Sequence, residues 1–395
     1  MTGRVVAAKA AQARRSAIRR IFDAAQGRSD LIRLEIGEPS FTTPAHIIEG
    51  ARAAALAGHT GYGPNGGLLS LRELLVDKLE TVDGIRSGPD EIIVTPGGMN
   101  ALFTTYLTLL EPGDEVLLPS PGFPNMDEMV RLLGGEPVFY PLLAESGYLP
   151  DPEVLTSLIT DRTAVLFINS PSNPTGAVIP GELMESLVAL ARKHDLWFIS
   201  DEVYDELILD PGIPHVAARR FDTDGRVISI YSFSKVYAMT GWRVGYAVAP
   251  RDVADVMRKL EEPQYSCPST ISQKGAEAAL LGPRAPIDQM RDAYRLRRDA
   301  AWAAMGRAGL RGQRSVGTLY QLIDVSGAGM PSLDFSLRLL DEASVTVAPG
   351  SVFGPLGEGL VRISFAASTE AIEEGIARIG RAVQTWGTTP RPPDG

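Results

Sequence analysis

Residues 228–248 read ISIYSFSKVYAMTGWRVGYAV. The stretch begins with β-branched and aromatic residues typical of a strand, and then breaks into small hydroxyl residues around one lysine, Lys235. Arg243 follows shortly before a second strand-like run. Most lysines are surface residues, but a lysine among small side chains at a strand exit can also act as a covalent nucleophile.

The composition is that of a globular protein large enough for two or three structural units. The chain has 395 residues, of which 44% are hydrophobic and 22% charged. Its formal net charge of −10 disfavours nucleic-acid binding, because phosphate backbones attract clustered lysine and arginine. No run of about 18 apolar residues occurs, so no membrane span is predicted.

Metal and disulfide chemistry have few candidate residues. Cys267 is the single cysteine, which excludes an internal disulfide and a thiolate cluster. The four histidines are scattered without the spacing of metal ligands. We therefore expect no metal site, and a cytoplasmic location fits this cysteine usage.

The two ends of the chain differ from its middle. The basic segment ARRSAIRRI resembles a targeting sequence, yet no apolar core follows it, and Ile18, Ile21 and Phe22 recur at helical spacing. We expect a helix of the mature protein there. Residues 388–395 are polar and proline-rich and are expected to be disordered.

Short apolar runs alternate with helix-like segments between these ends. The expected strands are 91–94, 115–118, 137–140, 164–168, 196–200, 227–231 and 245–249. Because these runs are continuously apolar, both faces of the sheet should be covered by helices. We therefore expect an α/β fold with a mostly parallel seven-stranded sheet between helices.

The pattern changes after a long helical stretch that begins near Ala285. Strand-like and helical segments there, including SVTVA at 344–348, indicate a smaller α+β unit. We expect residues 1–45 and 285–395 to form this small domain and residues 46–284 to form the large one.

Polar residues follow several strands, at the edge where ligands bind in such sheets. Gly97 and Gly98 open a helix whose backbone N–H groups could bind an anion, although a plain turn would need no ligand. Asn173 precedes Pro174, which keeps it out of the helical region, and its amide could donate to a ligand or belong to a turn.

Two charged residues occupy positions that are costly without a partner. Asp201 ends a strand, and Arg362 lies among apolar residues in LVRISFA. A helix cap or an internal salt bridge would explain each alone. Together with Lys235 and the glycines they provide an amine, an anion site, a carboxylate for a ring nitrogen and a cation for a substrate carboxylate. That set fits pyridoxal phosphate acting on an amino acid.

The chain resembles the class I/II aminotransferases, pyridoxal-phosphate enzymes of fold type I with the aspartate aminotransferase plan. The resemblance rests on IGEPSFTTPAHI, GYGPNGGLLSLRE, NSPSNPTG, SDEVYDEL, SFSKVYAMTGWRVGY and VRISFA, which occur in the family's order over nearly the whole chain. It implies transfer of an amino group between an L-amino acid and a 2-oxo acid through a Schiff base on Lys235.

The resemblance assigns the catalytic and ring-binding roles residue by residue. Lys235 would carry the Schiff base and move the proton, and Asp201 would pair with the ring nitrogen. Tyr204 and Asn173 would hydrogen-bond the ring's phenolic oxygen. Phe123 would stack on the ring.

Further residues would hold the cofactor phosphate. The resemblance implies backbone N–H groups of Gly98 and Met99 and the side chains of Ser232 and Arg243. Relatives often carry a polar side chain at the position of Met99, so one contact is expected to be missing. Tyr62 matches a tyrosine that reaches the neighbouring subunit's phosphate, which implies a homodimer.

On the substrate side, the resemblance implies that Arg362 binds the α-carboxylate and that Gly37 and Asn173 line the site. The substrate side chain stays open. Four aromatic residues could form an apolar pocket or belong to the core: Phe41, Phe123, Tyr320 and Phe353.

Two alternative functions remain. A lyase, cyclising synthase or oxidase of the same family would need the same lysine, aspartate and arginines, and only a transaminase would regenerate its cofactor with a 2-oxo acid. The ligand-sensing part of a transcription regulator would need an N-terminal helix-turn-helix domain, and the roughly 30 residues before the IGEP motif are too few for one.

Overall fold

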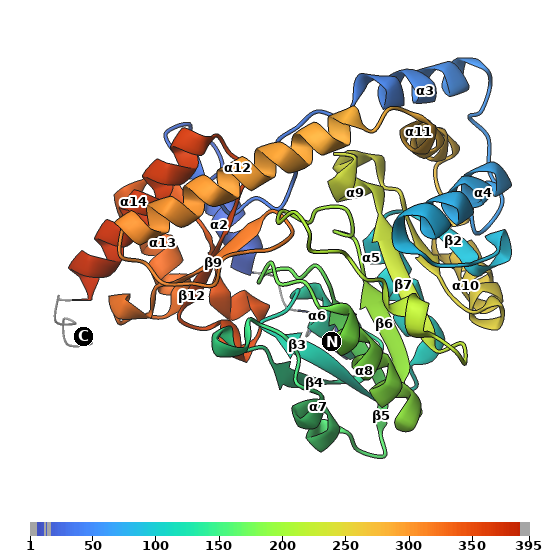
Figure 1. The fold of residues 1–395 in the computed structure, drawn as a ribbon, viewed down its shortest axis with the longest axis horizontal. Coiled ribbons are helices and arrows are strands. Elements are labelled where there is room, and N and C mark those ends of the chain that lie inside the picture. Colours follow the sequence, from blue (N-terminus) through green and yellow to red (C-terminus); the bar gives the residue numbers. More distant parts are fainter. Residues whose placement is uncertain (1–5, 12, 14–16, 388–395) are drawn as a thin grey trace, which may run out of the picture.

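The structure is a computed structural model that describes residues 6–11, 13 and 17–387 (Figure 1). The predicted disorder of residues 388–395 lies outside the described residues. The expected N-terminal helix is present as α2 (Ala17–Ala24), after a short helix α1 (Ala8–Ala11). Ile21 of α2 is fully buried, which explains the helical spacing of the apolar residues.

A seven-stranded sheet forms the centre of the fold, and this confirms the predicted fold class. Its strands in spatial order are β2 (Ile92–Thr95), β8 (Gly245–Val248), β7 (Val227–Ser232), β6 (Trp197–Asp201), β5 (Thr163–Asn169), β3 (Glu115–Ser120) and β4 (Glu136–Pro141). β8 runs antiparallel to both of its neighbours, and the other neighbouring pairs are parallel.

Helices cover both faces of this sheet (Figure 1). Val165 and Phe167 of β5 pack towards α5, α6 and α10, whereas Leu166 and Ile168 pack towards α7 and α8. The bounds of these helices are α5 (Gly98–Leu109), α6 (Asn125–Leu132), α7 (Pro152–Leu158), α8 (Gly181–Lys193) and α10 (Arg251–Tyr265). Because side chains alternate between two covered faces, β5 is apolar along most of its length.

Two small sheets lie beside the large one. β11 (Ala348–Pro349), β12 (Leu360–Ser364) and β9 (Tyr320–Asp324) form an antiparallel sheet, and β1 (Ile32–Arg33) pairs with β10 (Val345–Thr346) in parallel. The single strand expected at 344–348 is therefore divided between two sheets. Three helices accompany them: α12 (Ala285–Arg307), α13 (Ser332–Ala343) and α14 (Thr369–Trp386).

The remaining helices connect these parts. They are α3 (Ala45–Leu56), α4 (Leu69–Lys78), the short α9 (Phe233–Val236) and α11 (Thr270–Leu281). α3 packs along α11, although the two are far apart in sequence (Figure 1). Among the described residues, no helix combines the length and apolar character that a membrane crossing requires.

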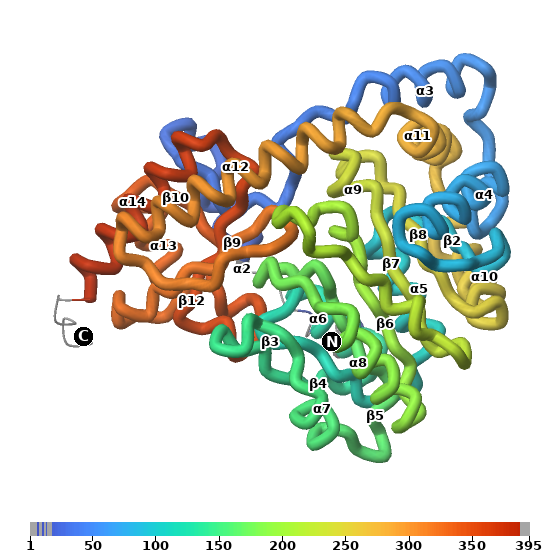
Figure 2. Tube along the Cα trace, in the orientation of Figure 1, coloured from blue at the N-terminus to red at the C-terminus, as the bar shows by residue number. Residues whose placement is uncertain are grey.

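The N-terminal segment lies alongside the C-terminal part of the chain (Figure 2). The backbone N–H of Leu34 donates to the Thr346 carbonyl at 3.0 Å, and the N–H of Ser364 donates to the Leu34 carbonyl at 2.8 Å. These bonds bring the loop that contains Gly37 next to β12, which carries Arg362. Residues from opposite ends of the chain thus meet above the large sheet's carboxyl edge.

Candidate active site

A cavity of about 350 Å³ lies at the carboxyl ends of β5, β6 and β7, closed on one side by the Gly37 loop and β12. It brings together every predicted site residue except Tyr62: Gly37, Gly98, Met99, Phe123, Asn173, Asp201, Tyr204, Ser232, Lys235, Arg243 and Arg362. The position agrees with the rule that ligands bind beyond the carboxyl ends of parallel strands.

Lys235 enters this cavity from the turn between β7 and α9. Ser232 ends the strand, and its Oγ caps the helix by accepting the N–H of Ser234 at 3.1 Å. This cap stops the strand and starts one helical turn that carries Lys235. The Lys235 ammonium donates to the Gly37 carbonyl at 2.5 Å, so the amine points at the loop that closes the cavity.

Asp201 is a buried carboxylate with a weak complement of hydrogen bonds. Its side chain ends β6, and Oδ1 accepts the Val203 N–H at 3.3 Å. Burial raises the pKa of Asp201 to about 7. The hydrogen bond from the Val203 N–H opposes this rise, and the adjacent Glu202 carboxylate adds to it. A cationic partner in the cavity would remove this penalty, and a protonated ring nitrogen is such a partner.

An anion cradle forms at the N-terminus of α5. Gly97 has φ +84°, and a Cβ on it would come within 2.5 Å of Nη2 of Arg243, so only glycine leaves room for the guanidinium there. Arg243 itself is held by the Thr240 carbonyl at 2.8 Å. Ser232 lies beside Gly98 at the same helix start. Backbone N–H groups, a hydroxyl and a guanidinium therefore converge where a phosphate fits.

Arg362 is buried, and only some of its N–H groups have hydrogen-bond partners among the described residues. Its Nη1 donates to Asn173 Oδ1 and its Nη2 to the Glu35 carbonyl, each at 3.0 Å. Its Nε is buried without a hydrogen-bond partner among the described residues. Tyr320 and Phe353 flank the guanidinium at 4.1 and 5.1 Å from their ring centres. A buried guanidinium with a free N–H calls for an anion, and a substrate carboxylate would supply one.

Two further lining residues have polar contacts with the predicted ones: Asn169 was not singled out from the sequence, and Tyr320 was left open between the pocket and the core. Asn169 accepts the Asn173 N–H at 2.7 Å and donates to the Asp201 carbonyl at 3.0 Å, so it ties two site residues together. The hydroxyl of Tyr320 lies 3.2 Å from that of Tyr204. A usable signal existed only for Asn169, which follows an apolar strand and opens NSPSNPTG.

The four aromatic residues left open by the sequence take different positions. Phe123 and Tyr320 line the cavity. Phe353 is buried against Arg362 outside the lining, and Phe41 packs edge-on against Tyr294 at 5.4 Å. Two of the four therefore belong to the pocket.

Tyr62 lies outside the cavity with 95% of its surface exposed. Its predicted reach to the site of a second subunit stays a prediction.

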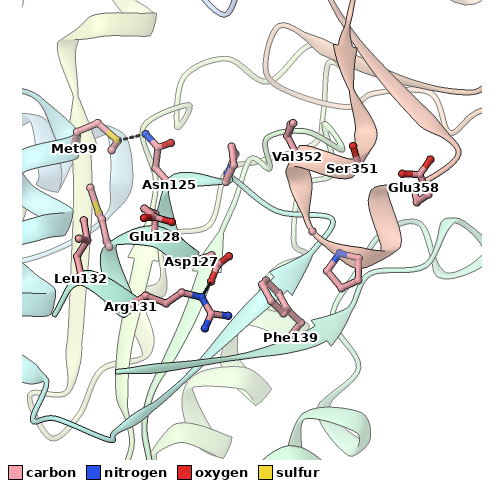
Figure 3. Close-up of a pocket in the computed structure, with 14 residues that line it drawn as sticks. Met99, Asn125, Asp127, Glu128, Arg131, Leu132, Phe139, Ser351, Val352 and Glu358 are labelled. Carbon is pink, nitrogen blue, oxygen red and sulfur yellow. Dashed lines mark hydrogen bonds and ion pairs between the residues drawn. The ribbon is translucent and has the colours of Figure 1, made fainter. Parts of the chain in front are cut away.

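A wider cleft of about 720 Å³ adjoins the cavity and shares Met99 with it (Figure 3). Its walls are α6 and the segment 351–358. The Asn125 amide donates to the sulfur of Met99 at 3.9 Å, and Arg131 pairs with Asp127 at 2.7 Å on the same wall. The cleft and the cavity thus have the flexible thioether side chain of Met99 in common.

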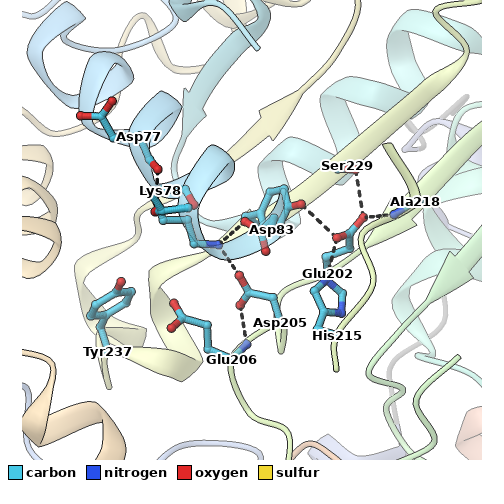
Figure 4. Close-up of polar contacts among 12 residues, drawn as sticks. Asp77, Lys78, Asp83, Glu202, Asp205, Glu206, His215, Ala218, Ser229 and Tyr237 are labelled. Carbon is cyan, nitrogen blue, oxygen red and sulfur yellow. Dashed lines mark hydrogen bonds and ion pairs between the residues drawn. The ribbon is translucent and has the colours of Figure 1, made fainter. Parts of the chain in front are cut away.

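A buried polar network surrounds Glu202, the residue that follows Asp201 in the chain (Figure 4). Glu202 accepts hydrogen bonds from the hydroxyls of Ser229 and Tyr231, both at 2.9 Å, and pairs with His215 at 2.8 Å. Burial works against the ionised Glu202, but its partners outweigh this effect and lower its pKa. For His215, burial is outweighed by Glu202, and the pKa is raised. The network ties β6 to β7 directly beside Asp201.

A second ion cluster adjoins this network. Lys78 at the end of α4 donates to Asp83 at 2.8 Å and to Asp205, and its ammonium lies 4.7 Å from the ring centre of Tyr231 (Figure 4). These contacts fasten α4 to the segment that follows β6. The carboxyl end of β6 is thus fixed from both sides.

Comparisons with known proteins show the family of the chain. The sequence profile of the family "Aminotransferase class I and II" matches residues 29–379. The chain is 40% identical to the aspartate/prephenate aminotransferase of Thermus thermophilus, over 90% of this chain and 91% of that protein. It is 38% identical to aromatic-amino-acid aminotransferase 2 of Thermococcus litoralis, over 93% and 96% of the two chains.

Solved structures give the same result. The aspartate aminotransferase from Thermus thermophilus with maleate superposes with a TM-score of 0.92 at 38% identity, covering 96% of this chain and 100% of that one. The chain therefore belongs to the class I and II aminotransferases, which are pyridoxal-phosphate enzymes. The residues present fit this cofactor. Among the residues that the structure describes, the buried Asp201 carboxylate has a backbone N–H but no cationic partner, and the buried Arg362 Nε has no hydrogen-bond partner. Gly97 leaves room for the Arg243 guanidinium at the helix start where the phosphate would bind.

Proposed function

We propose that this aminotransferase binds pyridoxal phosphate covalently through Lys235 and uses the same amine to move the substrate's α-proton. The observation that carries the proposal is the meeting of Lys235, Asp201 and Arg362 in one cavity of about 350 Å³. Lys235 provides the nucleophile, Asp201 provides a carboxylate to pair with the cationic ring, and Arg362 provides a cation to pair with the substrate carboxylate.

The binding residues have separate tasks. The N–H groups of Gly98 and Met99, with Ser232 and Arg243, hold the phosphate at the helix N-terminus. Phe123 stacks on the cofactor ring, which fixes its plane. These contacts keep the cofactor in place while its link to the lysine is exchanged.

Three residues control the electronics of the ring. When bound, pyridoxal phosphate supplies an electron sink for the charge left on the substrate α-carbon. Asp201 favours the protonated ring nitrogen by Coulomb attraction in a buried site. Tyr204 and Asn173 direct hydrogen-bond donors at the ring's phenolic oxygen.

Arg362 orients the substrate. A guanidinium that pairs with both carboxylate oxygens fixes the position and rotation of the α-carbon. Gly37 lets its loop pass close to Tyr320 at the edge of the site, since a Cβ there would lie 2.8 Å from the Tyr320 hydroxyl. The Lys235 amine would then be placed to take the α-proton as general base and to return a proton, as general acid, at the carbon two bonds away that comes from the cofactor's aldehyde.

A two-step absorbance experiment tests the activity. Mixing the enzyme with an amino-acid donor should change the cofactor spectrum, and adding a 2-oxo acid should restore it. If the enzyme were a lyase, a cyclising synthase or an oxidase, the 2-oxo acid would not restore the cofactor spectrum. Lys235→Ala should abolish turnover between donor and 2-oxo acid, because the proton can no longer be moved, while the circular dichroism spectrum stays that of the wild type.

We also propose a homodimer in which Tyr62 reaches the phosphate of the partner site. Exposed apolar side chains gather on α3, α4, α11 and the loop between α3 and α4: Ile48, Leu56, Tyr62, Leu69, Ile271 and Leu281. Exposed apolar side chains on elements that pack together, as α11 does with α3 and α4, support an interface.

Subunit complementation tests the dimer. Lys235→Ala and Tyr62→Ala proteins, unfolded and refolded together, should regain activity above either alone, because one of the two mixed sites then has both residues intact. Activity no higher than the sum of the parents, in a mixture shown to contain hybrid dimers, would contradict the crossing of Tyr62.

The division into a small domain (1–45 and 285–395) and a large domain (46–284) also belongs to this proposal. The pairing of β1 with β10 and the packing of α12 on α14 support it. A cytoplasmic location completes the proposal.

A further inference from the structure

Tyr320 forms a hydroxyl pair with Tyr204 inside the cavity. The two oxygens lie 3.2 Å apart, and the rings meet edge to face with centres 6.0 Å apart. Both side chains are buried. The Tyr320 hydroxyl also lies 3.4 Å from the Gly37 carbonyl, which accepts the Lys235 ammonium. Tyr320 therefore stands between the cofactor-binding lysine and the tyrosine assigned to the ring oxygen.

The protons of this pair can be counted. Each hydroxyl has one proton to donate and lone pairs to accept. If Tyr204 donates its proton to the cofactor's phenolic oxygen, as the proposed function requires, a proton shared by the two tyrosines comes from Tyr320. The Tyr320 hydroxyl can also donate to the Gly37 carbonyl at 3.4 Å, but the Tyr204 oxygen is nearer at 3.2 Å, and the Gly37 carbonyl already accepts a hydrogen bond from Lys235. A hydroxyl that accepts a hydrogen bond becomes a stronger donor itself, because chained hydrogen bonds polarise one another.

The charges around the pair favour this direction. Burial alone would raise the pKa of Tyr320, but Lys235, Arg362 and the bond to Tyr204 together lower it. Burial raises the pKa of Tyr204 well above its usual range, and Tyr320 and Asp201 add to the effect. The guanidinium of Arg362 and the Lys235 ammonium both lie on the Tyr320 side of the pair, so their positive charges favour Tyr320 as the donor.

The ring of Tyr320 has a separate contact. The guanidinium of Arg362 lies 4.1 Å from its centre. Replacing the hydroxyl alone leaves this cation–π contact in place, so the two parts of the side chain can be tested separately.

We infer that Tyr320 is a positioning residue for the cofactor, which acts through Tyr204 by donating the hydrogen bond that strengthens the Tyr204 donor at the ring oxygen. The inference rests on the proposed function, because it takes the cofactor to be bound at Lys235 with its phenolic oxygen at Tyr204. It adds to that function a residue from β9, in the part of the chain beyond α12.

The test is a pH titration of the visible absorbance of the reconstituted holoenzyme. Weaker donors at the ring oxygen leave its negative charge less stabilised, so the cofactor's lysine-linked nitrogen should hold its proton to higher pH. We expect Tyr320→Phe to raise the midpoint by about 0.3–1 pH unit, as expected for one net hydrogen bond, and Tyr204→Phe to raise it more.

A double variant gives the deciding comparison. If Tyr320 acts through Tyr204, Tyr320→Phe should have little left to change once Tyr204 is already phenylalanine. In that background it should shift the midpoint by less than about a third of the shift that it causes in the wild type. Tyr140→Phe is the matched control: its buried hydroxyl donates to the Phe167 carbonyl at 3.0 Å, away from the cavity, and its loss should leave the midpoint unchanged.

The results of this titration distinguish a failure of the role inferred for Tyr320 from a failure of the proposed function. An equal shift in both backgrounds, or no shift from Tyr320→Phe in a holoenzyme that titrates normally, would overturn the role of Tyr320. A wild-type protein whose bound cofactor shows no lysine-linked absorbance would instead overturn the proposed function.

Discussion

Replacing Arg362 by lysine tests the part of the site that orients the substrate. The arginine donates two N–H groups to Asn173 and to the Glu35 carbonyl, at 3.0 Å each, and its buried Nε has no hydrogen-bond partner within the described part of the chain. A lysine has one nitrogen and cannot hold both anchors while it presents two parallel donors to a carboxylate. The positive charge remains, but the fixed geometry is lost.

The magnitude follows from the hydrogen bonds that are lost. A hydrogen bond to a charged group contributes about 1.5–3 kcal/mol, so losing one or two charge-assisted bonds while the charge remains should cost about 2–4 kcal/mol. At 1.4 kcal/mol per tenfold, Arg362→Lys should lower kcat/KM for an amino-acid donor roughly 30- to 1,000-fold.

Steady-state kinetics at saturating cofactor measure this loss. The affinity for pyridoxal phosphate, titrated by absorbance, should stay within about threefold of the wild type. Arg381→Lys on α14, at an arginine whose side chain is 62% exposed, is the matched control and should have no effect. A loss of kcat/KM below threefold, or one that merely follows a loss of cofactor, would refute this role for Arg362.

Three further predictions concern the cofactor site and the network behind it. Asp201→Asn should lower kcat by about 10²- to 10³-fold at full cofactor occupancy, because the buried charge is lost, and near-normal turnover would exclude its electronic role. Gly97→Ala should weaken binding of pyridoxal phosphate at least about tenfold in an absorbance titration, because a Cβ would displace Arg243; unchanged affinity would exclude the cradle. His215→Gln should destabilise the protein by about 3 kcal/mol in urea unfolding near pH 6, because the buried Glu202 loses its partner. The pKa of His215 is raised in the folded state, so the stability difference between wild type and variant should be largest below about pH 6.5, as long as Glu202 stays ionised. This difference should shrink as the pH rises through the folded-state pKa of His215. A stability difference that grows with pH would contradict the ion pair.

The large sheet and the main site residues could be predicted because their signals are local. A strand covered on both faces is apolar along its length, as residues 164–168 show, and β5 forms there. Lys235 and Asp201 directly follow or end such strands, so the sheet's own geometry brings them to one edge.

The features that escaped prediction depend on partners distant in sequence. Residues 344–348 read as one strand, yet Val345 and Thr346 pair with β1 near the N-terminus while Ala348 pairs with β12. A local pattern carries no information on which distant segment competes for its hydrogen bonds. Tyr320 meets Tyr204 across 116 positions for the same reason, and nothing in TLYQLIDV distinguishes a cavity tyrosine from a core one.

The covalent link at Lys235 is the central claim, and reductive trapping tests it most directly. Treating the holoenzyme with borohydride and digesting it should yield one modified peptide, with the mass of reduced pyridoxal phosphate on Lys235. A label on another lysine, or cofactor that is released unchanged after reduction, would contradict the account.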